Sequence, residues 1–340
     1  MTDPSRRRPP VIADVARVAG VSVPTVSRVL TGSTPVSEEK RALVHAAIEK
    51  LGYRPNAAAR ALVSGRHSMI SVLAGNTTRY GYAATLQGVE EAARAAGYLV
   101  VITVVESDEP DVVDSAVGLV LGQAVAGAVV LEFDAAGIAA ARAVPGSVPV
   151  VTVSATRPGT HARPHAELDD RCAAAEAVDY LLGLGHRTVH HVSIPSTGPE
   201  VGRTLGWRDA LVAAGAPVTE PMAPGWHPSA GYDAGVHLAR DPEVTAVLAG
   251  NDQLAIGLMR AFMDAGRSVP EDVSVVGFDD EPFAEMWSPA LTTVRQDFVG
   301  LGHRAFALLD EQLRTGTSEA RSTAVPRLVV RGSAAPPPQA

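Results

Sequence analysis

The chain has 340 residues, 46% of them hydrophobic, and a formal net charge of −8, so it is long enough for two or more folded domains with sizeable cores. The single cysteine, Cys172, excludes a disulfide scaffold, and no stretch has the length and hydrophobicity of a membrane span or a signal peptide. We therefore expect a cytoplasmic protein in which Cys172 is a small buried hydrophobic side chain rather than a nucleophile.

Positive charge is concentrated near the N-terminus. Residues 1–66 contain eleven Lys and Arg against five Asp and Glu, a net charge of +6, whereas the remainder carries −14. Only the first part is therefore expected to attract phosphate groups. Residues 1–9, with Arg6, Arg7 and Arg8, are expected to be a flexible basic arm, which either only solubilises the chain or becomes ordered on DNA.

Residues 13–30 are typical of two short helices joined by a tight turn. Gly20 permits the turn, and Ser22 can cap the second helix by accepting from its free N–H groups. The expected apolar stripe of the first helix consists of Ala13, Val15, Ala16 and Ala19. This pattern indicates a helix-turn-helix element, although any small helical hairpin can share it.

The second helix of the pair is expected to be presented to DNA. Val23 and Pro24 occupy its first turn, where a proline is tolerated, and Val26 and Val29 face inward. Because Val23 and Pro24 cannot hydrogen-bond a base, they can read only thymine methyl groups or DNA shape. The outward groups suited to phosphate oxygens and base edges are Thr25, Ser27 and Arg28.

Two further helices are expected before the large acidic part of the chain. Ser37 is expected to cap a third helix that runs to Lys50, which completes a DNA-binding domain over residues 10–55. Residues 56–66 are expected to be a hinge helix and linker; isolated helices need about 12 to 15 residues, so this one should form only when packed. The apolar side of the third helix is expected to contain Ala42, Leu43, Ala46, Ile48 and Leu51.

From Ser68 onward, apolar runs alternate with Ala-rich amphipathic segments, which predicts parallel sheets covered by helices on both faces. In such sheets, ligands bind beyond the carboxyl ends of the strands. Polar residues emerge there: Asn76, Ser154, Asn251, Asp252, Asp279 and Asp280. The predicted strands are 70–74, 99–105, 127–132, 148–153, 189–194, 245–249 and 273–277, and the predicted helices include 85–96, 171–184, 202–214 and 253–265.

Five motifs stand in order along the acidic part of the chain: Gly185-His186, Arg203 with Gly206-Trp207, Gly250 to Gly257, Ser274 to Asp280 and Leu291 to Asp297. With the helix-turn-helix pattern before them, they resemble the LacI/GalR (lactose/galactose-repressor) family of bacterial transcriptional regulators. The resemblance implies an all-α helix-turn-helix head, followed over residues 67–332 by an α/β core of two periplasmic-binding-protein-like, doubly wound parallel-sheet subdomains. Their crossovers are expected near 155–168, 291–297 and 323–327, and residues 333–340 are expected to be a disordered Pro-rich tail.

The resemblance also implies the binding residues. In the head, the recognition helix begins at Val23 and Pro24 with Arg28 one turn on, and Leu62 is an apolar wedge in the minor groove. The hinge candidates are Asn56, Ala59 and Leu62. The effector candidates are Arg203, Asn251 and Asp279 as hydroxyl ligands, Gln296 from a crossover, Trp226 as an aromatic platform, and Asn76 after the first strand.

These residue types suit a mono- or disaccharide. Vicinal hydroxyls pair with Asp, Asn and Arg, and the C–H face of a pyranose stacks on an indole. Departures from the family pattern at Asn76, in the loop from Arg79 to Tyr82 and at Ser154 leave the sugar open. A separate departure is the apolar Val11 before the first helix, which leaves that helix start without the usual side-chain acceptor. Structural roles are also open: Asn251 can be a helix cap alone, Asp280 a cap, and Trp207 a core residue.

The expected function is a homodimeric repressor that leaves a pseudo-palindromic DNA operator when a carbohydrate binds. Co-repression and a non-sugar effector remain alternatives, whereas a solute-binding protein or an enzyme is disfavoured. We expect no cofactor and no metal: His190 and His191 are adjacent in a strand and point to opposite faces. We expect no catalytic residues either, because the adjacent carboxylates of Asp169-Asp170 do not supply an acid and base about 5 to 10 Å apart.

Overall fold

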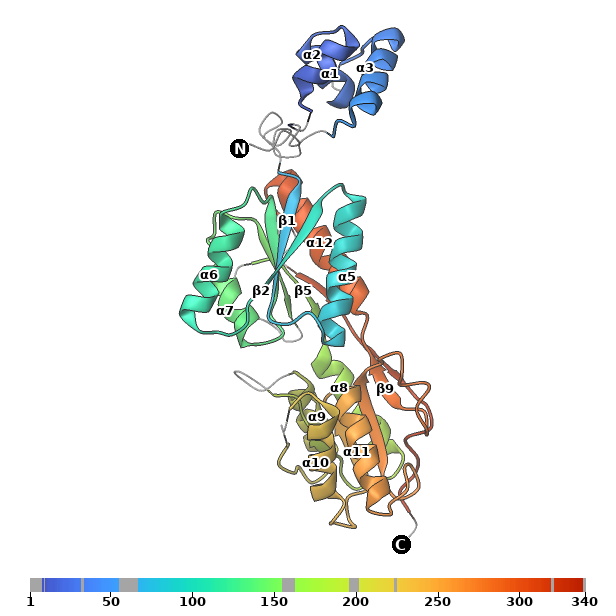
Figure 1. Ribbon diagram of the computed structural model, residues 1–340. Helices are drawn as coiled ribbons and strands as arrows, with labels where there is room; N and C mark the ends of the chain where they lie inside the picture. Colours follow the sequence, from blue (N-terminus) through green and yellow to red (C-terminus); the bar gives the residue numbers. More distant parts are fainter. Residues whose placement is uncertain are drawn as a thin grey trace, which may run out of the picture. The chain divides into compact units, whose positions relative to one another are not determined.

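The computed structural model describes residues 8, 10–31, 34–54, 67–154, 163–195, 202–222, 225–318 and 321–338 (Figure 1). It divides into two compact units, Met1–Ser68 and Met69–Ala340. The hinge candidates Asn56, Ala59 and Leu62 lie outside the described residues, as do Arg6 and Arg7 of the basic arm.

Among the described residues, the first unit contains the three helices expected before the hinge. Gly20 ends the first helix with φ of 67°, a left-handed conformation that glycine adopts readily. Val15, Val26 and Val44, one from each helix, are fully buried and form the centre of a small core. The helices are α1 (Ile12–Ala19), α2 (Val23–Thr31) and α3 (Glu38–Leu51).

The predicted apolar side of the third helix is wrong in part. Leu43 is 48% exposed, and Ala42 and Ala46 are exposed as well. The buried positions are Val44 and Ala47, and Ile48 and Leu51 pack beside them. In the first half of the helix, the buried stripe is therefore shifted by one residue from the predicted one. Ser37 is the N-cap residue of α3, but its side chain does not make the expected capping hydrogen bond.

The predicted apolar stripe of the first helix also needs one correction. Ala13 is exposed, and Ile12 packs against the core in its place.

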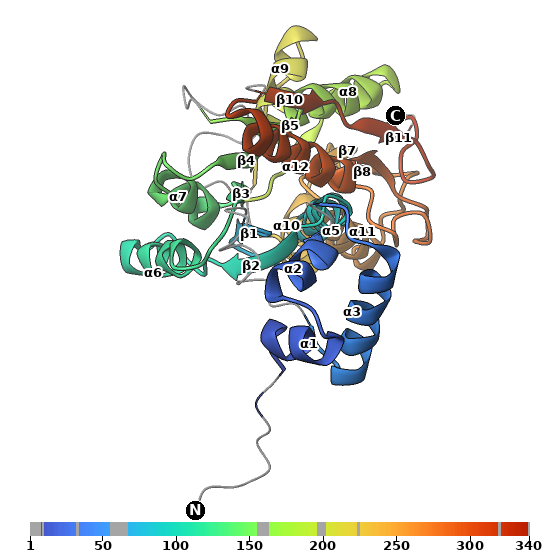
Figure 2. The ribbon, with the colours of Figure 1, turned by 90° about the horizontal axis from the view of Figure 1, so that it is seen from above.

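The first sheet of the second unit has six strands in the order β10-β5-β4-β3-β1-β2, and every pairing is parallel. Helices α5 (Tyr80–Ala95) and α12 (Phe298–Thr315) pack on one face, and α6 (Pro110–Leu121) and α7 (Ala135–Ala143) on the other (Figure 2). The strands are β1 (Met69–Ala74), β2 (Leu99–Val104), β3 (Gly127–Leu131), β4 (Val150–Ser154), β5 (His165–Leu168) and β10 (Arg321–Ala324).

The second sheet has five strands in the order β11-β9-β8-β7-β6 and is parallel except that β11 runs antiparallel to β9. Helices α8 (Asp170–Gly183) and α9 (Gly202–Ala213) cover one face, and α10 (Pro228–Leu238) and α11 (Asp252–Asp264) cover the other. The strands are β6 (His190–Val192), β7 (Ala246–Ala249), β8 (Ser274–Asp279), β9 (Thr292–Arg295) and β11 (Arg327–Val329).

The chain passes between the two sheets three times: after β5, between β9 and α12, and between β10 and β11. All seven predicted strands are present, with ends shifted by at most two residues. The sequence pattern did not predict β5 and β9, which lie inside expected crossover segments, or β10 and β11, which overlap the ends of the third one. These strands are only three or four residues long and rich in polar residues. In the parts of the chain that the structure describes, no helix is both long and apolar enough to cross a bilayer.

The C-terminal segment packs against the second sheet, so the expected disorder is wrong for residues 333–335. Ser333 is fully buried, and its hydroxyl donates to the Val275 carbonyl at 2.6 Å. The Ala335 carbonyl lies 3.0 Å from Nε2 of His186, whose Nδ1 lies 2.9 Å from the Thr245 hydroxyl. His186 therefore joins the tail to the sheet and has a structural role.

Two smaller expectations have mixed outcomes. Trp207 is fully buried and donates from Nε1 to the Val189 carbonyl at 2.7 Å, which confirms it as a core residue. Cys172 is exposed at the start of α8, so the expected buried role is wrong.

Candidate functional site

The second helix of the first unit presents polar groups on one side. Ser22 begins it: the Thr25 N–H lies 3.4 Å from the Ser22 hydroxyl, and the two hydroxyls are 2.9 Å apart. Arg28 and Pro24 are exposed and Val23 is 39% exposed, whereas Thr25 and Ser27 are half-buried. The helix can therefore offer a guanidinium, hydroxyls and an apolar tip to a partner in front of it.

Val11 is the N-cap residue of α1 and has no side-chain acceptor, as its identity implies. Asp14 partly compensates, because its carboxylate accepts from the Val11 N–H at 3.1 Å and pairs with Arg17 at 2.6 Å. The backbone N–H of Val11 and Arg17 together lower the pKa of Asp14, which keeps a negative charge at the positive end of the helix.

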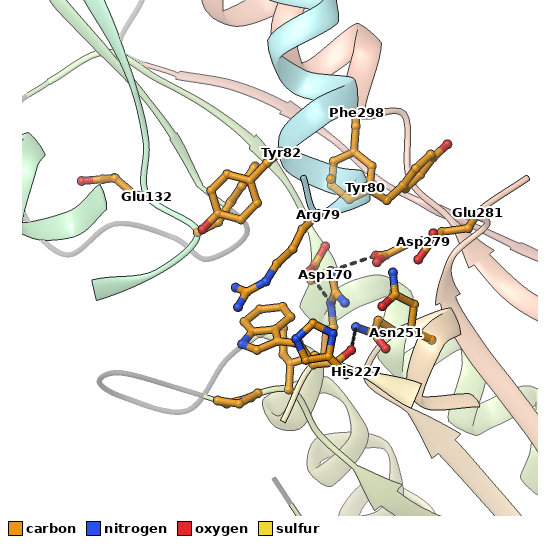
Figure 3. A pocket seen from close by; sticks show the side chains of 18 residues that line it. Arg79, Tyr80, Tyr82, Glu132, Asp170, His227, Asn251, Asp279, Glu281 and Phe298 are labelled. Carbon is orange, nitrogen blue, oxygen red and sulfur yellow. Dashed lines mark hydrogen bonds and ion pairs between the residues drawn. The ribbon is translucent and has the colours of Figure 1, made fainter. Parts of the chain in front are cut away.

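A cavity of about 890 Å³ opens in the second unit, where the carboxyl ends of strands from both sheets meet (Figure 3). On the side of the first sheet, the cavity is lined by the residue before α5 and its first turn, by the residues after β3, and by the start of α12. On the side of the second sheet, it is lined by the starts of α8, α9 and α11, the loop before α10, and the end of β8. This is the position where doubly wound folds bind ligands.

Arg203 is the centre of the polar side of the cavity. It is 5% exposed, and its Nε donates to Asp170 at 2.8 Å while Nη2 lies 3.2 Å from Asp279. Its guanidinium also donates to the Gly250 carbonyl and lies 4.1 Å from the centre of the Phe278 ring. These contacts fix the guanidinium in one plane, so the wall presents a rigid array of donors and acceptors.

Two carboxylates belong to this array: Asp170 is buried, and the Asp279 side chain is 12% exposed. Asp279 has φ of 111°, a conformation uncommon outside glycine, and its Oδ1 accepts from Nε2 of Gln296 at 2.8 Å. Burial raises the pKa of Asp170 to about 6, although Arg203 opposes the shift. Oδ1 of Asp170 has no hydrogen-bond partner among the described residues, so it is an unsatisfied acceptor in the wall.

Asn251 and Trp226 also lie at the cavity, and each is held by its surroundings. The Asn251 carbonyl oxygen accepts from the Leu254 N–H at 2.7 Å, and its Nδ2 donates to the Trp226 carbonyl at 3.1 Å. Asn251 thus caps α11 and fixes the backbone that carries the indole. The neighbouring Asp252 is fully buried beneath them, where it accepts from Thr293 and from the Glu281 N–H.

Two predicted effector residues do not line the cavity. Asn76 uses its side-chain oxygen within its own loop, accepting from the N–H groups of Thr78 at 2.8 Å and Arg79 at 2.9 Å. Gln296 is 5% exposed and lies behind Asp279. The structure therefore assigns Asn76 to shaping the loop and Gln296 to orienting Asp279. Asp280 is not a helix cap but pairs with Arg295 at 2.5 Å and Arg331 at 2.7 Å.

The sequence pattern missed an aromatic wall. Tyr80, Tyr82, Phe133 and Phe298 line the cavity and touch edge to face, with ring centres 5.0 to 6.4 Å apart. The Tyr82 hydroxyl is taken by Asp134 at 2.6 Å, so this wall offers mostly apolar surface. The chain has only fifteen aromatic residues: six Phe, six Tyr and three Trp. The amino-acid composition does not indicate that four of them meet at this cavity.

Two charged residues at the cavity were also missed. Burial raises the pKa of Glu281 to about 7, and the Asp279 charge adds to the shift. Arg79 extends across the cavity, and its guanidinium carbon lies 4.4 Å from the centre of the Trp226 ring (Figure 3). In the described ranges, no group of three His, Cys, Asp or Glu side chains is arranged to hold a metal ion.

Two family models match the chain. The model for bacterial regulatory proteins of the lacI family matches residues 11–56, and that for a periplasmic binding protein-like domain matches residues 178–334. Among curated relatives, catabolite control protein A of Priestia megaterium is 31% identical over 329 residues, which is 94% of this chain and 97% of the relative. The regulator GalR of Escherichia coli (strain K12) is 33% identical over 303 residues, 87% of each chain.

Solved structures match over nearly the full length. A lac repressor dimer bound to operator and the anti-inducer ONPF is similar with a TM-score of 0.88 and 28% identity, covering 96% of this chain and all of that one. A complex of the transcriptional regulator CelR with cellobiose is similar with a TM-score of 0.71 and 29% identity, covering 95% of this chain and 99% of that one.

Proposed function

The chain belongs to the lacI family of bacterial regulatory proteins, and on that basis we propose that it is a transcriptional repressor that leaves its DNA operator when a small carbohydrate binds. The observation that carries the proposal is the combination, in one chain, of a helix-turn-helix unit and a polar cavity between two sheets. It acts as a regulator rather than an enzyme, and as a reader of chromosomal DNA it works in the cytoplasm.

Operator binding uses the exposed side of α2. Arg28, Thr25 and Ser27 contact phosphate oxygens and base edges, and Ser22 holds the start of the helix. Val23 and Pro24 read thymine methyl groups or groove shape, since neither carries a polar side chain. The net charge of +6 on residues 1–66 supplies the general attraction to DNA. By family resemblance, Asn56, Ala59 and Leu62 add minor-groove contacts.

Effector binding uses the polar wall of the cavity. Arg203 and Asp279 form a planar donor and acceptor pair that suits two adjacent hydroxyl groups. Asn251 and Trp226 border the same space, while the aromatic wall covers the apolar face of a sugar ring. The proposed mono- or disaccharide lies in the cavity and in the open space before it, which together measure about 890 Å³ with solvent included.

The active form is proposed to be a homodimer, because an operator with two half-sites requires two heads. An exposed apolar surface on the second unit suits a second copy of the chain. Met286 is 76% exposed, Met263 62% and Trp287 40%, and the three side chains line one shallow groove beside α11. Large exposed apolar side chains gathered in one place are typical of protein interfaces.

The test is a fluorescence anisotropy titration of the purified protein with labelled duplexes that carry palindromes found upstream of its own and neighbouring genes. Addition of a panel of mono- and disaccharides to the complex should release the DNA with one of them. A coupling of about 1 to 3 kcal/mol corresponds to a change in operator affinity of roughly 5- to 150-fold. Tightening of the complex by a sugar would establish co-repression instead. Turnover of the sugar would overturn the regulatory assignment of the cavity.

A further inference from the structure

The cavity contains two guanidinium groups that differ in how their charge is balanced. Arg203 is matched by the carboxylates of Asp170 and Asp279, so its charge is neutralised within the wall. Arg79 stacks on Trp226, and among the described residues no carboxylate pairs with it and no oxygen accepts a hydrogen bond from its side chain. Its N–H donors are therefore available to a ligand.

Arg79 is also held in position. Its backbone N–H donates to the Asn76 side chain at 2.9 Å, and it is the N-cap residue from which α5 begins. The guanidinium carbon lies over the Trp226 ring, 4.4 Å from its centre, and this contact restrains the group without using its N–H donors. Figure 3 shows the Arg79 side chain reaching from the side of the cavity that holds Tyr82 and Phe298 toward His227.

We propose that Arg79 binds a carboxylate of the effector, so that the carbohydrate sensed by this repressor is an acidic sugar such as a uronic acid. The inference rests on the proposed carbohydrate-responsive function and specifies the class of sugar. Trp226 then acts as a positioning residue that orients Arg79, because the guanidinium covers the ring face that a pyranose would otherwise use.

The rest of the cavity favours a carboxylate over a phosphate. A carboxylate is planar, carries one negative charge, and matches the guanidinium fork with two parallel hydrogen bonds. A phosphate ester carries nearly two charges and would be repelled more strongly by Glu281 and Asp279 in the same wall. The hydroxyl groups of the acidic sugar face the Arg203 and Asp279 pair.

The test is isothermal titration calorimetry of the full-length protein with matched pairs of sugars: D-glucuronate and D-glucose, D-galacturonate and D-galactose, and D-mannuronate and D-mannose. D-glucose 6-phosphate serves as the phosphate probe. In at least one pair the acid should bind more tightly by about 10- to 150-fold, the range expected for hydrogen bonds to a charged group.

Arg79→Gln should bring the ratio of acid affinity to neutral-sugar affinity close to one, because glutamine keeps a planar amide near Trp226 but removes the charge that distinguishes the two sugars. Arg94→Gln is the matched control: Arg94 lies on the same helix, paired with Glu90 at the surface, and the ratio should persist. Neutral sugars that bind as tightly as the acids, tighter binding of the phosphate ester, or an unchanged ratio in Arg79→Gln would each overturn the inference while leaving the carbohydrate response standing. Failure of both members of every pair to bind, together with no effect on operator binding from any mono- or disaccharide of the panel, would instead overturn the carbohydrate effector itself.

Discussion

The buried carboxylate of Asp170 should make the stability of the second unit depend on pH. Its side chain is 2% exposed, one oxygen accepts from Arg203 at 2.8 Å, and Oδ1 has no partner among the described residues. Burial raises its pKa from 3.8 to about 6 against the attraction of Arg203. The folded state therefore holds this proton more tightly than the unfolded chain, and ionisation destabilises the fold as the pH rises through this range.

The perturbation that isolates this effect is Asp170→Asn, which keeps the shape and one acceptor for Arg203 but cannot ionise. A pKa shift of about two units corresponds to about 3 kcal/mol at neutral pH. About 2 kcal/mol of this amount develops between about pH 4.5 and 7.5. The free energy of unfolding of the variant minus that of the wild type should therefore increase by about 2 kcal/mol over the same range.

The assay is urea unfolding followed by tryptophan fluorescence at several pH values. Trp207, Trp226 and Trp287 all lie in the second unit, so the signal reports on that unit alone. The control is Asp264→Asn, because Asp264 is exposed and its pairing with Arg260 lowers its pKa. For this control, the free energy of unfolding of the variant minus that of the wild type should change little over the same pH range, and in the opposite direction. A difference for Asp170→Asn that stays flat from pH 4.5 to 7.5 would refute the reasoning.

Three further predictions concern function. Arg203→Ala should bind the operator at low temperature but lose the response to carbohydrate in anisotropy titrations, and a normal response would exclude Arg203 from effector binding. Its free energy of unfolding should fall by about 3 to 5 kcal/mol, because Asp170 and Asp279 lose their partner. Leu62→Ser should weaken operator binding in anisotropy titrations and leave sugar binding intact by calorimetry, and unchanged operator affinity would remove the wedge assignment. Met286→Lys with Met263→Lys should convert the dimer to monomers in analytical ultracentrifugation, because both side chains are largely exposed in the proposed interface; a persistent dimer would place the interface elsewhere.

Much of the site followed from local sequence. Asn251 and Asp279 were predicted because polar residues that follow an apolar strand lie at the ligand-binding edge of a parallel sheet, whereas Arg203 was predicted from the family resemblance. All three line the cavity. The same rule selected Asn76, whose oxygen is instead used by its own loop. Short polar side chains compete in this way for nearby backbone N–H groups, so position after a strand does not by itself make a ligand.

Other parts of the site had no local signal. Tyr82, Phe133 and Phe298 come from three separate elements, and nothing in their neighbouring residues indicates that their rings meet. The third helix shows a similar limit: its apolar residues allow two stripes one position apart, and only packing against Val15 and Val26 selects the one through Val44.

The sequence by itself determined the helix-turn-helix, the apolar strands and the membership in a family, because hydrophobic period, caps and motif order are local properties of the chain. Only the tertiary structure decided that Arg79 lies on Trp226, that Arg203 is already neutralised by Asp170 and Asp279, and that the aromatic residues form one wall. The physical reason is that these contacts join elements that are far apart in the chain. Arg79 and Trp226 come from elements of different sheets, and the other contacts link helices and strand ends around a single sheet, so their distances depend on how these elements pack and not on the residues beside each side chain.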